Sequence, residues 1–154
     1  MRRTITVDNG HFRFRYKVIY KTVGSLVPLI LCKYGFRTDR ICKKDEPYIV
    51  VANHLTEVDM LMAAGAFSEH MFFVAGEHLL RTKAGSKMKW AQDPIFTYKG
   101  APSIDTMREV IRRIKAGHNV MIFPEGSRSF NGETIRLDNG IAKLVKMAGC
   151  ALAT

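Results

Sequence analysis

Hydrophobic and polar positions follow two different spacings along this chain. After Pro47, short continuous apolar runs predict strands buried on both faces, because a strand with one exposed face would alternate apolar and polar residues. These predicted strands lie at 48–51, 71–75, 95–98 and 120–123. Another strand is expected to begin at 150–154.

Between these runs, apolar residues recur at steps of three and four, and this spacing predicts helices with one buried face. The predicted helices lie at 59–67, 103–116 and 141–148, with a helix and a loop of undefined limits at 77–90. Ser103 can cap its helix, while Gly117 and Gly149 mark helix ends. The strand–helix alternation predicts an α/β fold with a mostly parallel or mixed central sheet flanked by helices.

The segment before the first strand has the pattern of a basic amphipathic helix. Apolar residues recur at helical spacing over 12–34, and Arg13, Lys17 and Lys21 share another face. Its uncharged stretch, 22–32, has eleven residues, whereas crossing a bilayer takes about 20. A helix that lies in the membrane interface fits this pattern best. The alternative is a helix that packs against its own domain.

Charge divides the 154-residue chain into two parts. Residues 1–44 carry eleven basic and two acidic residues, a net charge of +9, whereas residues 45–154 carry thirteen and twelve, a net charge of +1. We therefore expect a basic amphipathic helical segment over 1–44 and an α/β domain over 45–154. Such a basic segment predicts a polyanionic partner, either anionic lipid or nucleic acid. Its apolar residues have helical spacing, which favours a membrane surface, so we expect peripheral attachment and no nucleic acid.

Cysteine and histidine positions give no support for a disulfide framework or a metal site. The cysteines form an odd set without C-x-x-C spacing, which fits a reducing compartment: Cys32, Cys42 and Cys150. His70 and His78 are conceivable metal ligands, but a third ligand at suitable spacing is missing. Four histidines are therefore interpreted as surface or structural residues: His11, His70, His78 and His118.

A histidine and a carboxylate lie five positions apart where the first apolar run ends. In the segment Asn53-His54-Leu55-Thr56-Glu57-Val58-Asp59, His54 falls in the turn after the strand and Asp59 in the first turn of the next helix. The chain can fold back there to place Asp59 against one ring nitrogen, which would orient His54 as a general base. Structural His–Asp pairs are also common, so this segment alone does not establish catalysis.

A second polar segment follows the run 120–123 and reads Phe123-Pro124-Glu125-Gly126-Ser127-Arg128-Ser129. Gly126 lets the backbone turn tightly, and successive amide groups there can form an anion nest. Arg128 offers a planar fork that matches phosphate oxygens, and Glu125 can bind a hydroxyl or orient Arg128. Taken alone, such a segment is more often a polar turn with an exposed ion pair.

Together the two segments resemble the first and third sequence blocks of the glycerolipid acyltransferases, a family that includes the 1-acylglycerol-3-phosphate acyltransferases. The resemblance implies that His54 is the base and Asp59 its partner. It further implies a substrate site formed by Asn53, Glu125, Gly126, Ser127 and Arg128.

A third segment, Ile95-Phe96-Thr97-Tyr98-Lys99-Gly100, resembles the second block of that family loosely. Lys99 stands where the family often has an arginine, so it would meet phosphate as a point charge without bidentate geometry. The resemblance covers roughly residues 48–150. We therefore expect the chain to lack a C-terminal part of the family's domain.

The resemblance implies transfer of a fatty acyl group from an acyl thioester to the free hydroxyl of 1-acylglycerol-3-phosphate. The donor would be acyl-CoA or an acyl carrier protein, and no metal or other cofactor is required. The expected partners are this donor, the lysophospholipid acceptor and the cytoplasmic face of a membrane that contains anionic lipid. The alternative is a catalytically inactive, truncated, membrane-associated lipid-binding protein.

Overall fold

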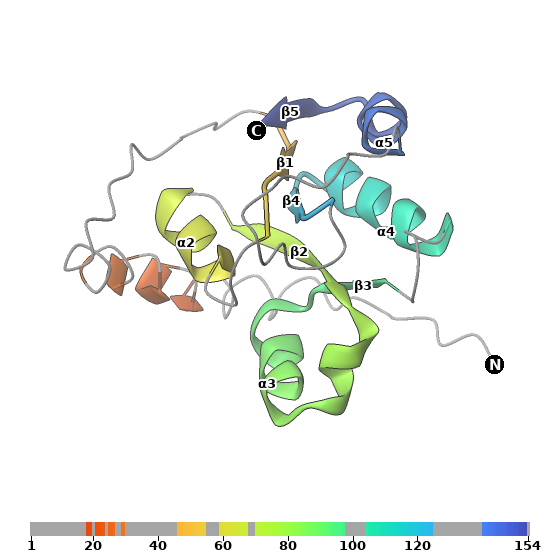
Figure 1. The fold of residues 1–154 in the computed structure, drawn as a ribbon. Coiled ribbons are helices and arrows are strands. Elements are labelled where there is room, and N and C mark those ends of the chain that lie inside the picture. Colours follow the sequence, from red (N-terminus) through yellow and green to blue (C-terminus); the bar gives the residue numbers. More distant parts are fainter. Residues whose placement is uncertain are drawn as a thin grey trace.

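The computed structural model describes residues 18–19, 21–23, 25–26, 29, 46–54, 59–67, 70–97, 104–124 and 140–153 (Figure 1). Helices and strands alternate along the main part of the chain. In order, these elements are β1 (Tyr48–Val51), α2 (Asp59–Ala66), β2 (Met71–Gly76), the 3-10 helix η1 (Glu77–Arg81), α3 (Lys83–Gln92), β3 (Ile95–Thr97), α4 (Ile104–Lys115), β4 (Asn119–Ile122), α5 (Gly140–Ala148) and β5 (Ala151–Ala153).

The strands form one five-stranded sheet with the order β3-β2-β4-β1-β5. Every neighbouring pair is parallel, so the predicted α/β fold is confirmed and its sheet is parallel rather than mixed. In the centre of the sheet, Val51 of β1 lies opposite Ile122 of β4. The carboxyl ends of all strands therefore point toward the same edge of the sheet.

The core consists of two layers, one on each face of the sheet. On one face, Ile49, Phe72 and Val120 pack with residues of α4 and α5, among them Val110 and Leu144. Alternate residues of the same strands point to the opposite face. There Tyr48, Val50, Phe73 and Met121 pack with Ala63 and Phe67 from the region of α2. Because helices cover both faces, as Figure 1 shows, the strands appear in the sequence as continuous apolar runs.

Element limits agree closely with the predicted ones, and the stretch 77–90 resolves into η1 and α3. Gly117 and Gly149 follow α4 and α5 with φ angles of 81° and 66°, the left-handed conformation that favours glycine at a helix end. Ile104 begins α4 and is 69% exposed, although helices between the apolar runs were predicted to bury their apolar face. Thr106 is buried in the first turn instead, and its hydroxyl donates to the Phe96 carbonyl oxygen at 3.3 Å.

Most of the predicted basic segment 1–44 lies outside the described residues, as do Ser103 and the boundary between the two predicted parts. The described residues between 18 and 29 are helical. Among them, Val18, Leu26 and Leu29 are exposed. In the described part of the chain, no helix is both long enough and apolar enough to span a bilayer.

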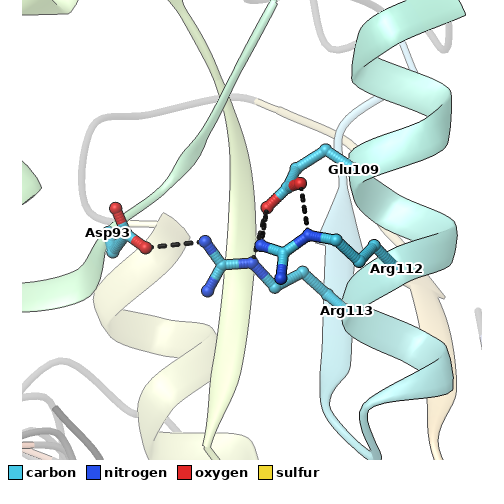
Figure 2. A network of polar contacts seen from close by, with 4 residues as sticks. All are labelled: Asp93, Glu109, Arg112 and Arg113. Carbon is cyan, nitrogen blue, oxygen red and sulfur yellow. Dashed lines mark hydrogen bonds and ion pairs between the residues drawn. The ribbon is translucent and has the colours of Figure 1, made fainter. Parts of the chain in front are cut away.

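A buried arginine joins α4 to the segment that precedes β3 (Figure 2). The Arg113 guanidinium contacts Asp93 Oδ2 at 2.6 Å and Glu109 Oε1 at 2.8 Å, and it lies over the Phe72 ring, 4.3 Å from its centre. Glu109 also binds Arg112. Burial alone would raise the pKa of Glu109, but the hydrogen bonds from the two arginines outweigh it and lower that pKa.

His70 packs edge-on against Phe72, with 4.7 Å between ring centres, and His118 contacts the same ring at 5.2 Å. Burial first, then the charges of His118 and Arg113, lower the pKa of His70 to about 3. His70 is therefore a structural histidine, in agreement with the sequence-based interpretation.

We expect replacement of His70 by phenylalanine to flatten the pH dependence of stability. Between about pH 6.5 and pH 3, His70 is protonated in the unfolded chain but stays neutral in the folded chain. The free energy of unfolding therefore falls with decreasing pH, by at most about 1.4 kcal/mol per pH unit from this residue. Urea unfolding at pH 7, 6 and 5 measures the slope. The control His78→Phe, at an exposed position on η1, makes the same substitution elsewhere, and equal slopes in both variants would contradict the assignment.

Candidate active site

The two segments predicted to form the site, 53–59 and 123–129, begin beside each other at the carboxyl edge of the sheet. β1 and β4 are adjacent and parallel, and the Ala52 amide beyond β1 donates to the Ile122 carbonyl at 3.3 Å. The chain therefore leaves both strands at the same place. His54 follows β1 within three residues, and Phe123 and Pro124 follow β4 directly.

His54 and Asp59 form the contact that their spacing predicts. Nδ1 of His54 lies 2.9 Å from Oδ2 of Asp59, with side-chain exposures of 25% and 14%. Asp59 is the first residue of α2, where the helix dipole favours a negative charge. When Asp59 is ionised, its carboxylate can only accept a hydrogen bond, so this contact favours the tautomer of His54 that carries its proton on Nδ1. Nε2 of His54 then keeps its lone pair and can accept a proton.

Phe123 is a residue of this site that sequence reasoning missed. Its ring stacks on the His54 imidazole, with 4.5 Å between ring centres and 27° between ring planes. Asp59 fixes one ring nitrogen and Phe123 one ring face, so the orientation of the imidazole is restrained in two ways. Only the pairing of β1 with β4 could have revealed this contact. Val51 lies opposite Ile122, so the next residue, Phe123, comes close to the chain that leaves β1.

The structure describes only part of the predicted substrate site. Asn53 is exposed and immediately precedes His54. Pro124 is half-buried and is followed in sequence by the rest of the second polar segment. The other predicted substrate residues lie outside the described residues: Lys99, Glu125, Gly126, Ser127 and Arg128. Their roles stay predictions.

Within the described ranges, no three side chains of histidine, cysteine, aspartate or glutamate gather to form a metal site. Cys150 is a half-buried free thiol. Burial raises its pKa, which disfavours the reactive thiolate form. The arrangement best suited to proton transfer in this part of the chain is therefore the imidazole that Asp59 and Phe123 orient.

The fold matches that of a known enzyme. The structure superposes with a TM-score of 0.70 on the crystal structure of the 1-acyl-sn-glycerophosphate (LPA) acyltransferase, PlsC, from Thermotoga maritima. The match covers 95% of this chain and 60% of that chain. Sequence identity is 21%, so this similarity establishes the fold alone.

Curated relatives of this chain are also named as 1-acyl-sn-glycerol-3-phosphate acyltransferases. The chain is 28% identical over 106 residues to 1-acyl-sn-glycerol-3-phosphate acyltransferase alpha of Ovis aries, and 27% identical over 106 residues to the Homo sapiens protein of that name. These matches cover 67% of this chain but only 37% and 38% of the two relatives. A family model described as Acyltransferase matches residues 35–154. Since this match spans most of the chain and includes both segments at the sheet edge, the protein belongs to the acyltransferase family.

Proposed function

We propose that the protein transfers a fatty acyl group from an acyl thioester to the free hydroxyl of 1-acylglycerol-3-phosphate. The observation that carries this proposal is the 2.9 Å contact between His54 and Asp59 at the sheet edge where the second polar segment begins. The names of the curated relatives support the choice of acceptor. The chain spans less than two fifths of the length of these relatives, so acceptor and activity are both part of the proposal.

In the proposed reaction, Nε2 of His54 takes the proton of the acceptor hydroxyl as that oxygen attacks the thioester carbonyl carbon. Asp59 stabilises the imidazolium that forms, and the stacked ring of Phe123 keeps the imidazole in place. Backbone donors, for which Gly126 is the candidate, stabilise the tetrahedral oxyanion. When the carbon–sulfur bond breaks, the thiolate takes the proton from the imidazolium and leaves as a thiol. The ester is the second product, and no metal or redox cofactor takes part.

The phosphate end of the acceptor would be held by the second polar segment. Arg128 would bind phosphate oxygens through its planar fork, and Lys99 would add a point charge. Glu125 would bind a glycerol hydroxyl or orient Arg128, with Ser127 and Asn53 completing the site. The donor would be acyl-CoA or an acyl carrier protein.

We further propose peripheral attachment to the cytoplasmic face of a membrane with anionic lipid through the segment 1–44. Its net charge of +9 supports attraction to anionic headgroups. The exposed helical residues Val18, Leu26 and Leu29 support insertion of apolar side chains at the interface. Nucleic acid is not part of this proposal.

Product formation tests the proposed reaction directly. The full chain is incubated with a labelled acyl-CoA, or a labelled acyl carrier protein, and 1-acylglycerol-3-phosphate, and labelled diacylglycerol phosphate is measured. Monoacylglycerol, which lacks the phosphate, is the matched acceptor and should give far less product. Saturable binding of the lysophospholipid without product from either donor would instead identify a lipid-binding protein that has lost turnover.

We expect Arg128→Ala to raise the KM for 1-acylglycerol-3-phosphate by about 10- to 100-fold, because loss of a charge-assisted contact to phosphate removes about 1.5–3 kcal/mol. The KM for the thioester should change little. Steady-state kinetics with each substrate varied in turn separates the two constants. Arg108→Ala, an exposed arginine on α4, is the control and should leave both constants unchanged. Equal increases of both KM values in Arg128→Ala would argue against a phosphate role.

A further inference from the structure

The connection between β2 and β3 forms a small helical lobe, η1 with α3, which projects from the sheet in Figure 1. Thr82 joins its two helices, because its hydroxyl donates to the Leu79 carbonyl at 2.9 Å and accepts from the Gly85 amide at 2.9 Å. Gly85 is buried at this contact. A Cβ atom there would lie 1.7 Å from the Leu79 carbonyl oxygen, so only glycine permits the observed approach. The η1–α3 lobe is therefore a preformed surface.

One face of α3 combines cationic side chains with a large aromatic ring. Lys83, Lys87 and Trp90 follow each other at steps of four and three, so they share one helix face. All three are exposed, and Trp90 is 59% exposed. On η1, Leu80 is 38% exposed and its neighbour Arg81 is exposed as well. The exposed side chains of the lobe thus include both basic and apolar groups.

The lobe carries an excess of positive charge. Residues 76–92 carry four basic residues, Arg81, Lys83, Lys87 and Lys89, against Glu77, a net charge of +3. The rest of residues 45–154 carries nine basic and eleven acidic residues, a net charge of −2. Charge complementarity therefore favours an anionic partner for this surface in particular.

Exposed tryptophan beside lysine is the combination that membrane interfaces favour. The indole ring is stable at the headgroup level, where one part of it is apolar and another can donate a hydrogen bond. Lysine stems can lie along the apolar boundary while their ammonium groups contact anionic headgroups.

We propose that the η1–α3 lobe docks on a membrane surface with anionic lipid, with Trp90 and Leu80 at the headgroup boundary and Lys83 and Lys87 against the headgroups. This contact is separate from the segment 1–44. η1 follows the carboxyl end of β2, and β2, β4 and β1 are parallel neighbours, so the lobe leaves the sheet at the edge that carries His54. If the proposed function holds, this contact turns the site toward the membrane from which the acceptor comes.

Trp90 is the single tryptophan of the chain and reports on its own environment. The full chain is titrated with vesicles of phosphatidylcholine containing about one third phosphatidylglycerol, without any acyl donor, so the result does not depend on turnover. We expect a blue shift of the Trp90 emission and quenching by lipids brominated near the headgroup, both absent with pure phosphatidylcholine. Co-sedimentation of the protein with the vesicles at unchanged Trp90 emission would overturn the proposal, because segment 1–44 alone would then account for binding.

A matched pair of double variants tests the lysines. Lys83→Gln with Lys87→Gln should weaken vesicle binding by about 10-fold or more, since each basic residue near an anionic surface contributes several-fold. The control, Lys143→Gln with Lys146→Gln on the exposed face of α5, removes the same charge and should change affinity much less. Equal losses in both pairs would contradict a specific role of the lobe. A Trp90 shift with a soluble acidic carrier protein, but not with anionic vesicles, would replace the lipid by a protein partner.

Discussion

Replacement of His54 by alanine is expected to lower the rate of acyl transfer by about 10²–10⁴-fold, the range that a positioned general base contributes. The variant keeps the sheet edge but has no group to take the proton of the acceptor hydroxyl. The variant loses the contact to Asp59 and the stacking on Phe123, so we expect a modest loss of stability. The fold should be retained, because His54 follows β1 outside the sheet. Initial rates at saturating substrate, with thermal unfolding of the same preparation, give both quantities.

Asp59→Asn provides the second arm of this experiment. The asparagine amide keeps the shape of the carboxylate but can donate a hydrogen bond to Nδ1 of His54. This favours the tautomer that carries its proton on Nε2, and Nε2 can then not accept the proton of the acceptor hydroxyl. We expect a large loss of rate with the fold retained. His78→Ala, at an exposed histidine, is the control and should behave as wild type. Near-wild-type turnover in His54→Ala would remove the proposed mechanism, whatever the effect of Asp59→Asn.

Most of the fold could be predicted from the sequence because its strands are buried on both faces. Tyr48, Ile49 and Val50 are each at most 3% exposed, and such strands appear as unbroken apolar runs. The helix ends at Gly117 and Gly149 could also be predicted from local sequence, since a residue in the left-handed conformation after a helix is most often glycine. The His54–Asp59 contact could also be predicted, because it spans a single turn between a strand and a helix.

Features that depend on contacts distant in sequence could not be predicted in this way. Nothing local to β1 or β4 specifies that they are neighbours, so the stacking of Phe123 on His54 was invisible until the strand order was known. Nothing in the sequence around Arg113 indicates its burial, yet this residue is 5% exposed. Its burial depends on Asp93, twenty residues earlier in the chain.

Arg113→Met is expected to destabilise the fold by about 3 kcal/mol, a large fraction of the roughly 5–15 kcal/mol that holds a domain together. Methionine replaces the apolar stem but leaves two carboxylates, on Asp93 and Glu109, without the guanidinium that joins them. Removal of one partner from a buried ion pair costs about 3–5 kcal/mol. The lower end applies because Asp93 and Glu109 are 23% and 31% exposed and water can solvate them in part. Urea unfolding at pH 7 measures the loss.

Arg112→Met is the matched control, because it removes the same charge from the adjacent residue. Arg112 binds the same carboxylate, that of Glu109, but its side chain is 50% exposed, and solvent screening reduces such a contact to about 0–1 kcal/mol. The double variant Arg113→Met with Asp93→Asn removes both partners of the 2.6 Å contact. It should be less destabilised than the sum of the two single variants, because each single variant loses the Arg113–Asp93 contact and the double variant loses it only once. Equal losses in Arg112→Met and Arg113→Met, or strict additivity in the double variant, would show that burial of this arginine does not make its contacts stronger than those at the surface.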